Sequence, residues 1–372
     1  MGDANSVESV TLKRLAEKGL LPAPRPAVGV ISNVSVNTLG DSYRGALLGT
    51  AIGDALGRPA EGRSPHILRE RYGRLTDFQP WKGWRDGSVG TVTDDTQLTM
   101  CVAECLFAND GRINPVDLAE RFVAWLPIGR GKGQTCIEAV SALTGGTPWH
   151  EAGVASAGNG AAMRAAPVGL VHIGNLDALR RDAALSAVVT HADPMAVSSA
   201  VAHAWLVARL AATPPASLDP AALVADLCDV ISDIPDPGSP ERDWQHRPGK
   251  TSAPIRLVDR LAEVPRWLGA PPELASDWFY CGAFVLESLP MALWHFLGTP
   301  DNPEEAVVNA VMAGHDADTV ASMTGAYAGA YLGELAFPPR WTGDNLEFAD
   351  ELRGLADRLL MLADREAEHS DD

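Results

Sequence analysis

The sequence predicts an all-α protein folded as one compact domain of many helices. Apolar residues recur at the three- and four-residue spacing of a helix through most of the chain, and the alternating Val, Ile and Thr runs of strands are nearly absent. With 372 residues, 46% of them hydrophobic, the chain is long and apolar enough for a large core. We expect an N-terminal extension with one short helix at 1–40, a helical domain at 41–366 and an acidic tail at 367–372.

Helices and loops can be placed in chain order. One apolar face runs through residues 98–106 and another through 197–208, both with helical spacing. The string Asn302-Pro303-Glu304-Glu305 is typical of a helix start, with Asn as N-cap, Pro in the first turn and acids behind it. Loops are expected at 73–90, 129–133, 145–148, 214–215 and 234–254. The last of these separates segments that carry parts of one site, so we do not treat it as a linker between domains.

Two helices are expected to carry glycine at every fourth position. Glycine inside a helix costs about 1 kcal/mol relative to alanine, so the stripes need a compensating reason. Small residues allow two helix backbones to approach closely, and the charges of Asp54, Arg58 and Glu334 exclude membrane spans here. We predict two tightly packed core helices, one with Gly45, Gly49, Gly53 and Gly57 and the other with Gly325, Gly329 and Gly333.

Charge and cysteine content narrow the function classes. The formal net charge is −18, which argues against nucleic acid as a partner because phosphate binding needs a basic face. No apolar run approaches the roughly 18 residues of a membrane span, and the charged N-terminus does not have the pattern of a signal peptide. Five scattered cysteines are typical of a reduced intracellular protein. We therefore expect a cytoplasmic protein without a membrane partner.

Two acidic clusters precede helices. Thr93-Asp94-Asp95-Thr96 comes before a helix expected near Gln97, and the string 314–319 (Gly-His-Asp-Ala-Asp-Thr) comes before the second glycine-striped helix. Asp and Thr are favoured N-caps, so capping explains either cluster alone. Four carboxylates close together are costly without a cation, and carboxylate plus hydroxyl oxygens select hard ions such as Mg²⁺, Mn²⁺ or Ca²⁺. More than half of the chain separates the clusters, so these residues alone leave capping and metal binding open.

Two glycine-rich loops are candidates for anion binding. The loop 129–135 opens a helical stretch at 136–143, and backbone N–H groups at a helix N-terminus suit a diphosphate. In the loop 156–160, Asn159 offers both a donor and an acceptor. Neither loop is a Walker or dinucleotide fingerprint, and glycines in tight turns are the alternative explanation for both.

As an ordered set, these motifs resemble the ADP-ribosylglycohydrolases, the dinitrogenase-reductase-activating and ADP-ribosylarginine hydrolase group. Residues 44–57 (RGALLGTAIGDALG) followed by Glu61 are similar to the opening of that family, and residues 93–96 to its first metal motif. Residues 158–164 and 190–193 are similar to its middle motifs, and residues 316–319 to its last metal motif. The resemblance runs from about Tyr43 to Gly333.

The resemblance implies an all-α domain with two divalent cations, Mg²⁺ or Mn²⁺, at the bottom of a cleft. The matching metal ligands are Thr93, Asp94, Asp95, Asp316, Asp318 and Thr319. Glu61 matches a mobile metal or substrate contact, and a solvated loop acid is the alternative. The implied substrate-binding residues are Glu61, Gly131, Gly133, Ser156, Gly158, Asn159, Gly160 and His191. We expect Arg164 to brace the cluster acids or a helix end, and His203 and His315 to be structural.

The implied activity is hydrolysis of the glycosidic bond at C1″ of ADP-ribose, which releases ADP-ribose from an ADP-ribosylated protein or other target. ADP-ribosyl-arginine is the first expectation. Alternatives are an O-linked (serine or acetyl-ester) hydrolase and a catalytically silent ADP-ribose-binding relative. Asp95 or Asp316 is expected to accept the proton of the attacking water.

The sequence departs from the family pattern at two places, and both departures bear on which linkage is cleaved more than on metal binding. Residues 127–131 lack the acid that the dinitrogenase-reductase branch carries ahead of its phosphate-loop threonine. A cluster carboxylate would then have to serve as the base. His315 and Ala317 stand where Gly and Thr are common, and neither change removes an expected ligand.

Overall fold

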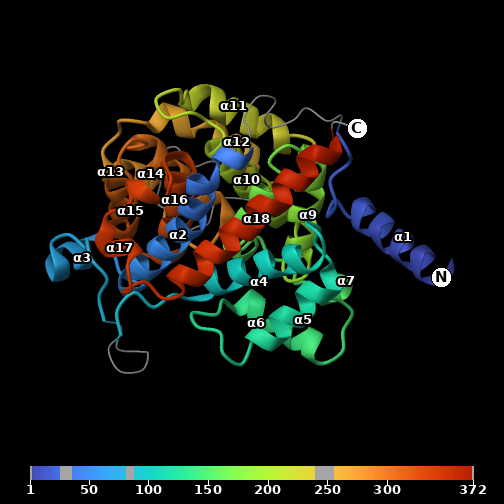
Figure 1. Cartoon of the computed structure of the whole chain (residues 1–372). Helices are drawn as coiled ribbons and strands as arrows, with labels where there is room; N and C mark the ends of the chain where they lie inside the picture. The colour runs from blue at the N-terminus through green and yellow to red at the C-terminus, as the bar shows by residue number, and fades with distance from the viewer. Residues whose placement is uncertain (1, 26–35, 81–87, 239–254, 371–372) are drawn as a thin grey trace.

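The computed structural model describes residues 2–25, 36–80, 88–238 and 255–370, and it confirms the all-α prediction (Figure 1). In these ranges the only β pairing consists of two isolated bridges, Val154 with His191 and Gly158 with Phe284. None of the helices in the same ranges combines the length and the apolar character of a membrane-crossing segment. Parts of two expected loops, 81–87 and 239–254, lie outside the described residues, as do positions 371–372 of the expected tail.

The centre of the fold is the predicted pair of glycine-striped helices, α2 (Gly40–Gly57) and α16 (Ala317–Leu332), which pack directly on each other. A Cβ atom added to Gly49 would overlap the backbone of Gly325, and one added to Gly53 would overlap the backbone of Ala321. The compensating reason for the glycines is therefore close backbone contact. Gly333 is different, because it ends α16 with φ +84° and does not belong to the helix interior.

The remaining helices surround this pair (Figure 1). Helix α16 also packs against α10 (Pro194–Ala211), α14 (Val285–Gly298) and α15 (Pro303–Met312). Helix α18 (Ala349–Ser370) lies across α2, α4 (Asp94–Ala108) and α8 (Ala166–Val171). The outer helices are α3 (Pro65–Tyr72), α5 (Pro115–Trp125), α6 (Gln134–Thr144), α7 (Trp149–Ala152), α9 (Leu176–Val188), α11 (Pro220–Ile231), α12 (Leu257–Ala262), α13 (Pro272–Phe279) and α17 (Pro339–Thr342).

The N-terminal segment contains the expected helix, although it is longer than expected. Helix α1 (Gly2–Glu17) projects from the edge of the molecule (Figure 1). Leu15 and Leu20 are buried in the core, and the Arg25 backbone N–H donates to Asp177 at 2.6 Å. The end of this segment is thus attached to the helical body.

Two predicted helix starts need correction. Helix α4 begins at Asp94 rather than near Gln97, because the Gln97 N–H already donates to the Thr93 carbonyl at 3.1 Å. Helix α16 begins at Ala317, so the second acidic cluster reaches into its first turn. The start of α15 is as predicted, with the Asn302 side chain accepting from the Glu305 N–H at 3.0 Å. The acids therefore occupy first turns, where helix N–H groups lack carbonyl partners.

Candidate functional site

A cavity of about 490 Å³ lies where the N-termini of α4, α6 and α16 meet the loop 156–160. Every site residue expected from the sequence lines this cavity except Thr93, which lies behind it. The expected residues that line it are Glu61, Asp94, Asp95, Gly131, Gly133, Ser156, Gly158, Asn159, Gly160, His191, Asp316, Asp318 and Thr319. The fold thus assembles one site from segments spread over most of the chain.

The two acidic clusters meet in this cavity. The Thr319 hydroxyl oxygen lies 3.4 Å from Asp95 Oδ2 and 3.4 Å from Asp316 Oδ1. On the other side of the cluster, Glu61, Asp316 and Asp318 each place a carboxylate oxygen within 4.8 Å of the others. Side chains far apart in sequence therefore form one oxygen-rich group.

Helix capping does not explain the side chains at the N-cap positions of α4 and α16. Neither Thr93 nor Asp316 makes a side-chain capping bond to its own helix. The Thr93 hydroxyl donates to Asp54 Oδ1 at 2.8 Å, and Asp316 Oδ2 accepts from Asn159 Nδ2 at 2.6 Å. Each side chain bonds to a residue of another segment, and Asp316 and its partner Asn159 both line the cavity.

Asp54 is an important residue that the motif analysis missed. It is completely buried in α2 and accepts hydrogen bonds from the backbone N–H and hydroxyl groups of both Thr93 and Thr96, at 2.6 to 3.2 Å. These four donors hold the chain that leads into α4. The sequence feature that could have pointed to Asp54 is its charge inside a glycine-striped helix. That charge served only as an argument against a membrane span.

Burial and mutual repulsion raise the pKa values of the acids in this group. Burial raises the pKa of Asp316 to about 6 and that of Asp318 to about 7, and the neighbouring Asp316 adds to the shift of Asp318. Burial and nearby carboxylates hold the pKa values of Asp94 and Asp95 well above their usual range. Arg58, 3.5 Å from Asp318, supplies positive charge on one side. A cation at the centre would relieve the repulsion.

One oxygen in this group supports a bound cation directly. Asp95 Oδ1 is buried and has no hydrogen-bond partner within the described part of the chain. A buried oxygen without a partner is costly, because it has given up its bonds to water. Carboxylate and hydroxyl oxygens around it are the ligands that Mg²⁺ and Mn²⁺ prefer. The residues present therefore fit a divalent cation beside Asp95.

The glycine-rich loop 129–133 packs against the acidic cluster. Gly131 has φ +68°, and a Cβ there would lie 2.9 Å from the Thr93 Cβ. The Gly133 N–H donates to Asp94 Oδ2 at 3.3 Å, and α6 begins at the next residue. The positive end of the α6 dipole thus lies at the wall of the cavity, where it favours an anion.

His191 lines the same cavity as a neutral ring. Burial and the charge of Arg164 lower the pKa of His191 to about 3, and its Nδ1 lies 2.8 Å from the Thr190 hydroxyl. Arg164 is a brace, as expected, because its guanidinium donates to the Gly160 carbonyl, the Ser186 carbonyl near the end of α9 and the Thr190 hydroxyl. It supports the loop 156–160 from behind.

His315 joins the Glu61 segment to the Asp316 segment. Its backbone N–H donates to the Arg63 carbonyl at 2.8 Å, and its carbonyl accepts from the Gly62 N–H at 2.7 Å. The His315 ring lies 4.6 Å from the Tyr280 ring, with Nδ1 3.0 Å from Tyr280 Oη. His203 bonds to the Tyr327 hydroxyl in the core. Both histidines have the structural roles expected.

The cavity also contains residues outside the expected set. Most of them lie in or next to the two glycine-rich loops, which were the sequence features that could have pointed to them. No sequence pattern pointed to Ala283 or Phe284. The Gly158–Phe284 bridge and a bond from the Val285 N–H to the Ala157 carbonyl bring these two residues in. The additional lining residues are Lys132, Gln134, Thr135, Cys136, Ala157, Met163, Ala283 and Phe284.

Comparison with known proteins gives consistent matches. The profile of the ADP-ribosylglycohydrolase family matches residues 35–369. An uncharacterized protein of Archaeoglobus fulgidus is 33% identical over 87% of this chain and 97% of its own. ADP-ribosylhydrolase ARH3 of Gallus gallus is 29% identical over 80% of this chain and 87% of its own. A solved structure described as an ADP-ribosylglycohydrolase-related protein complex is 29% identical, with a TM-score of 0.68 over 88% of this chain and 99% of that one.

Proposed function

The chain belongs to the ADP-ribosylglycohydrolase family, and from this premise we propose that it is a divalent-metal-dependent hydrolase that cleaves the glycosidic bond at C1″ of ADP-ribose. The observation that carries the proposal is the position of the Thr319 hydroxyl between Asp95 and Asp316. It brings the oxygens of both acidic clusters to one point at the base of the cavity. The reaction needs a water held and deprotonated beside C1″ and a ribose fixed in place as positive charge develops on it, and an oxygen-rich group that holds cations can supply both.

The proposed ligands of two cations, Mg²⁺ or Mn²⁺, are Thr93, Asp94, Asp95, Asp316, Asp318 and Thr319. Thr93 does not line the cavity, but its hydroxyl gives its proton to Asp54 and lies 3.3 Å from Asp95 Oδ2. Its lone pairs remain available on the Asp95 side. When bound, the cations would orient the ribose hydroxyls and acidify water.

The catalytic carboxylates in this proposal are Asp95 and Asp316, one of which accepts the proton of the attacking water. Asp95 offers the unpartnered Oδ1, and Asn159 and Thr319 hold Asp316 in place. With no acid in residues 127–131, a carboxylate of the cluster takes this role. Proton transfer by a positioned carboxylate contributes typically 10²- to 10⁴-fold to rate.

The two glycine-rich loops, 129–133 and 156–160, are proposed to bind the diphosphate and a ribose. The N-terminus of α6, which begins directly after Gly133, favours phosphate oxygens. Ser156 lies 3.0 Å from the Thr135 hydroxyl, and the Gly158 N–H donates to Ser156 at 3.3 Å. Gly160 leaves room for His191, because a Cβ there would lie 2.9 Å from the imidazole.

We propose ADP-ribosyl-arginine as the linkage cleaved, on an ADP-ribosylated protein in the cytoplasm, with residues 41–366 as the catalytic domain. A guanidinium leaving group is cationic, and the cavity is lined by Glu61, Asp94 and Asp318. Asp94 and Asp318 are committed to the cations in this proposal. Glu61, whose side chain is 37% exposed, is therefore the acid of this trio that can face such a group, and it would share its charge between that group and Arg58, with which it is paired. An O-linked substrate would gain nothing from that charge.

The test is a hydrolysis panel with arginine-, serine- and acetyl-ester-linked ADP-ribose, run with Mg²⁺, with Mn²⁺ and with EDTA. We expect metal-dependent release of ADP-ribose from the arginine linkage, lost in Asp316→Ala with the fold retained by circular dichroism. The matched control is Asp301→Ala, which removes an exposed acid between α14 and α15. Release from the serine or ester linkage alone would favour the O-linked alternative. Full activity of Asp316→Ala would refute the catalytic role of Asp316.

A further inference from the structure

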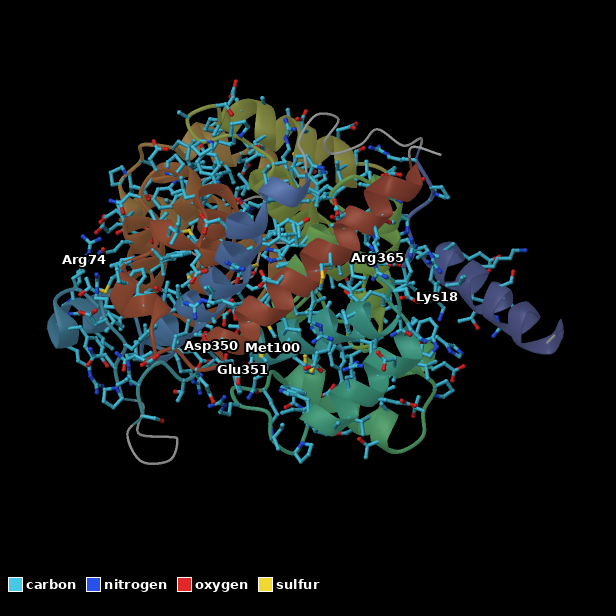
Figure 2. All side chains as sticks on the ribbon, viewed as in Figure 1. Lys18, Arg74, Met100, Asp350, Glu351 and Arg365 are labelled. Carbon is cyan, nitrogen blue, oxygen red and sulfur yellow. The ribbon has the colours of Figure 1, made fainter. Side chains whose placement is uncertain are left out.

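Arg164 is a completely buried cation next to the candidate site. The charged side chains that Figure 2 labels, such as Lys18 and Arg74, lie at the edge of the molecule, whereas Arg164 has 0% of its surface exposed. Its Nη2 donates to the Ser186 carbonyl at 2.8 Å and to the Thr190 hydroxyl oxygen at 2.7 Å. A guanidinium has donors and no acceptor, so the Thr190 oxygen must be the acceptor in the second bond.

The proton of the Thr190 hydroxyl group is then directed to another acceptor. His191 Nδ1 lies 2.8 Å from the hydroxyl oxygen. The Cys136 thiol also interacts with this hydroxyl, but sulfur accepts hydrogen bonds only weakly, and an imidazole nitrogen is the stronger acceptor. The Thr190 hydroxyl therefore donates its proton to Nδ1.

The position of the single ring proton of His191 follows from this bond. Burial and the charge of Arg164 lower the pKa of His191 to about 3, so the ring is neutral and one nitrogen carries a proton. Because Nδ1 is the acceptor, the proton is on Nε2. In this form Nε2 can neither bind a metal ion nor take the proton of the attacking water.

The Nε2 atom faces the cavity. It makes no hydrogen bond within the described part of the chain, and it keeps accessible surface in the cavity wall. Gly158 and Gly160 leave it uncovered, because Cβ atoms added at these positions would lie 3.5 and 3.2 Å from Nε2. The cavity therefore has a fixed N–H donor that no protein group satisfies.

The surroundings of this donor favour a negatively charged acceptor. Gly160 also borders the first turn of α6, because a Cβ added to it would lie 3.4 Å from Cys136 Sγ. The positive end of the α6 dipole and the His191 N–H group thus act on the same part of the cavity. An oxygen that only accepts hydrogen bonds, such as a phosphoryl oxygen, suits a fixed donor better than a hydroxyl group, which has a proton of its own to place.

We propose that Thr190 is a positioning residue, which together with Arg164 holds His191 as an Nε2–H donor to a diphosphate oxygen of bound ADP-ribose. The identity of the ligand rests on the proposed function, and the position of the proton rests on the contacts of these three side chains. Thr190 itself is buried and does not line the cavity. It acts on the ligand only through His191.

The first arm of the test is ¹⁵N NMR of the imidazole nitrogens in the ligand-free protein. We expect a single form of His191, with the proton on Nε2 and a hydrogen bond accepted by Nδ1. Thr190→Val should shift the Nδ1 resonance, because Nδ1 loses its donor, and Thr190→Ser should keep it. A proton on Nδ1 in the wild type, or an unshifted Nδ1 resonance in Thr190→Val, would overturn the proposal. The wild-type spectrum decides the proton position even if Thr190→Val does not fold.

The second arm is calorimetric titration with ADP-ribose in saturating Mg²⁺. We expect Thr190→Val to bind about tenfold more weakly, as for a lost hydrogen bond to a charged group, and Thr190→Ser to bind as the wild type does. The matched control is Thr144→Val near the end of α6, where the hydroxyl bonds to the Val140 carbonyl of its own helix. It should leave the affinity unchanged. Equal affinity of Thr190→Val and the wild type would overturn the positioning role.

The two arms separate this proposal from the proposed function. If the wild type does not bind ADP-ribose, the assignment of the ligand falls together with the hydrolase function. The NMR arm contains no ligand, so it still decides whether Thr190 and Arg164 fix the proton of His191 on Nε2.

Discussion

Asp95 of α4 and Asp316 at the start of α16 are joined through a single hydroxyl group. Thr319 Oγ1 lies 3.4 Å from a carboxylate oxygen of each. Helix α4 carries the first acid, and the second stands at the N-terminus of α16, which packs on α2. The arrangement explains why neither cluster can be interpreted in isolation.

Thr319→Val removes this hydroxyl while keeping the shape of the side chain. We expect about tenfold weaker binding of Mn²⁺ or Mg²⁺ and a parallel loss of metal-induced thermal stabilisation, since a lost ligand or ligand partner typically costs 10- to 100-fold in affinity. Thermal shift over a metal titration measures both. Thr213→Val at the end of α10, where the hydroxyl bonds only to the Arg209 carbonyl, is the control. Equal metal affinity in both variants would remove Thr319 from the ligand set.

Asp54→Asn tests the residue that holds the first acidic cluster. An amide cannot accept all four hydrogen bonds that the buried carboxylate accepts from Thr93 and Thr96. We expect a loss of about 2–4 kcal/mol in the free energy of unfolding, together with weaker metal binding. Urea unfolding with and without Mg²⁺ measures both effects. If stability drops but metal affinity does not, Asp54 supports the fold alone.

Gly49→Ala tests the contact between α2 and α16. The added methyl would overlap the Gly325 backbone, which cannot move aside as a side chain can. We expect a loss of about 3 kcal/mol in the free energy of unfolding. Gly354→Ala in α18, where a Cβ meets no atom within 4 Å, is the control and should add about 1 kcal/mol. Similar values for the two variants in urea unfolding would contradict the packing described here.

His172 makes stability depend on pH. Burial acts to lower the pKa of His172, but hydrogen bonds to Asp182 and Glu366 outweigh it and raise the pKa. The charged ring joins α8 and α9 to the end of α18. Because the folded-state pKa is the higher one, its stabilisation is complete below the unfolded value of about 6.5 and is lost as pH rises through the folded value.

The corresponding variant is His172→Gln, which keeps hydrogen-bonding groups but cannot be protonated. We expect the wild type to exceed it in unfolding free energy at pH 6, and the difference to shrink toward pH 9. Urea unfolding at several pH values measures the difference. A gap that stays constant with pH would show that folding does not shift the pKa of His172, and a gap that widens toward pH 9 would show that folding lowers it.

Much of the fold follows from local patterns. Helical spacing at residues 98–106 and the Asn302-Pro303 start depend on a few neighbouring residues, and both are confirmed. The glycine stripes also predicted two tightly packed helices in the core, and the structure adds that α2 and α16 pack on each other. The exact first residues of α4 and α16 could not be predicted from the local sequence. Acids can stand before a helix or inside its first turn with the same local sequence.

The sequence by itself determined the helical class, the paired glycine helices and the chemical character of the acidic clusters, since each depends on residue type and spacing within a few turns. Tertiary structure alone decided that Asp95, Asp316 and Thr319 meet, that Asp54 holds the first cluster, and that Phe284 lines the cavity. The physical reason is that these contacts join residues tens to hundreds of positions apart. No local periodicity records which distant helix a side chain will face.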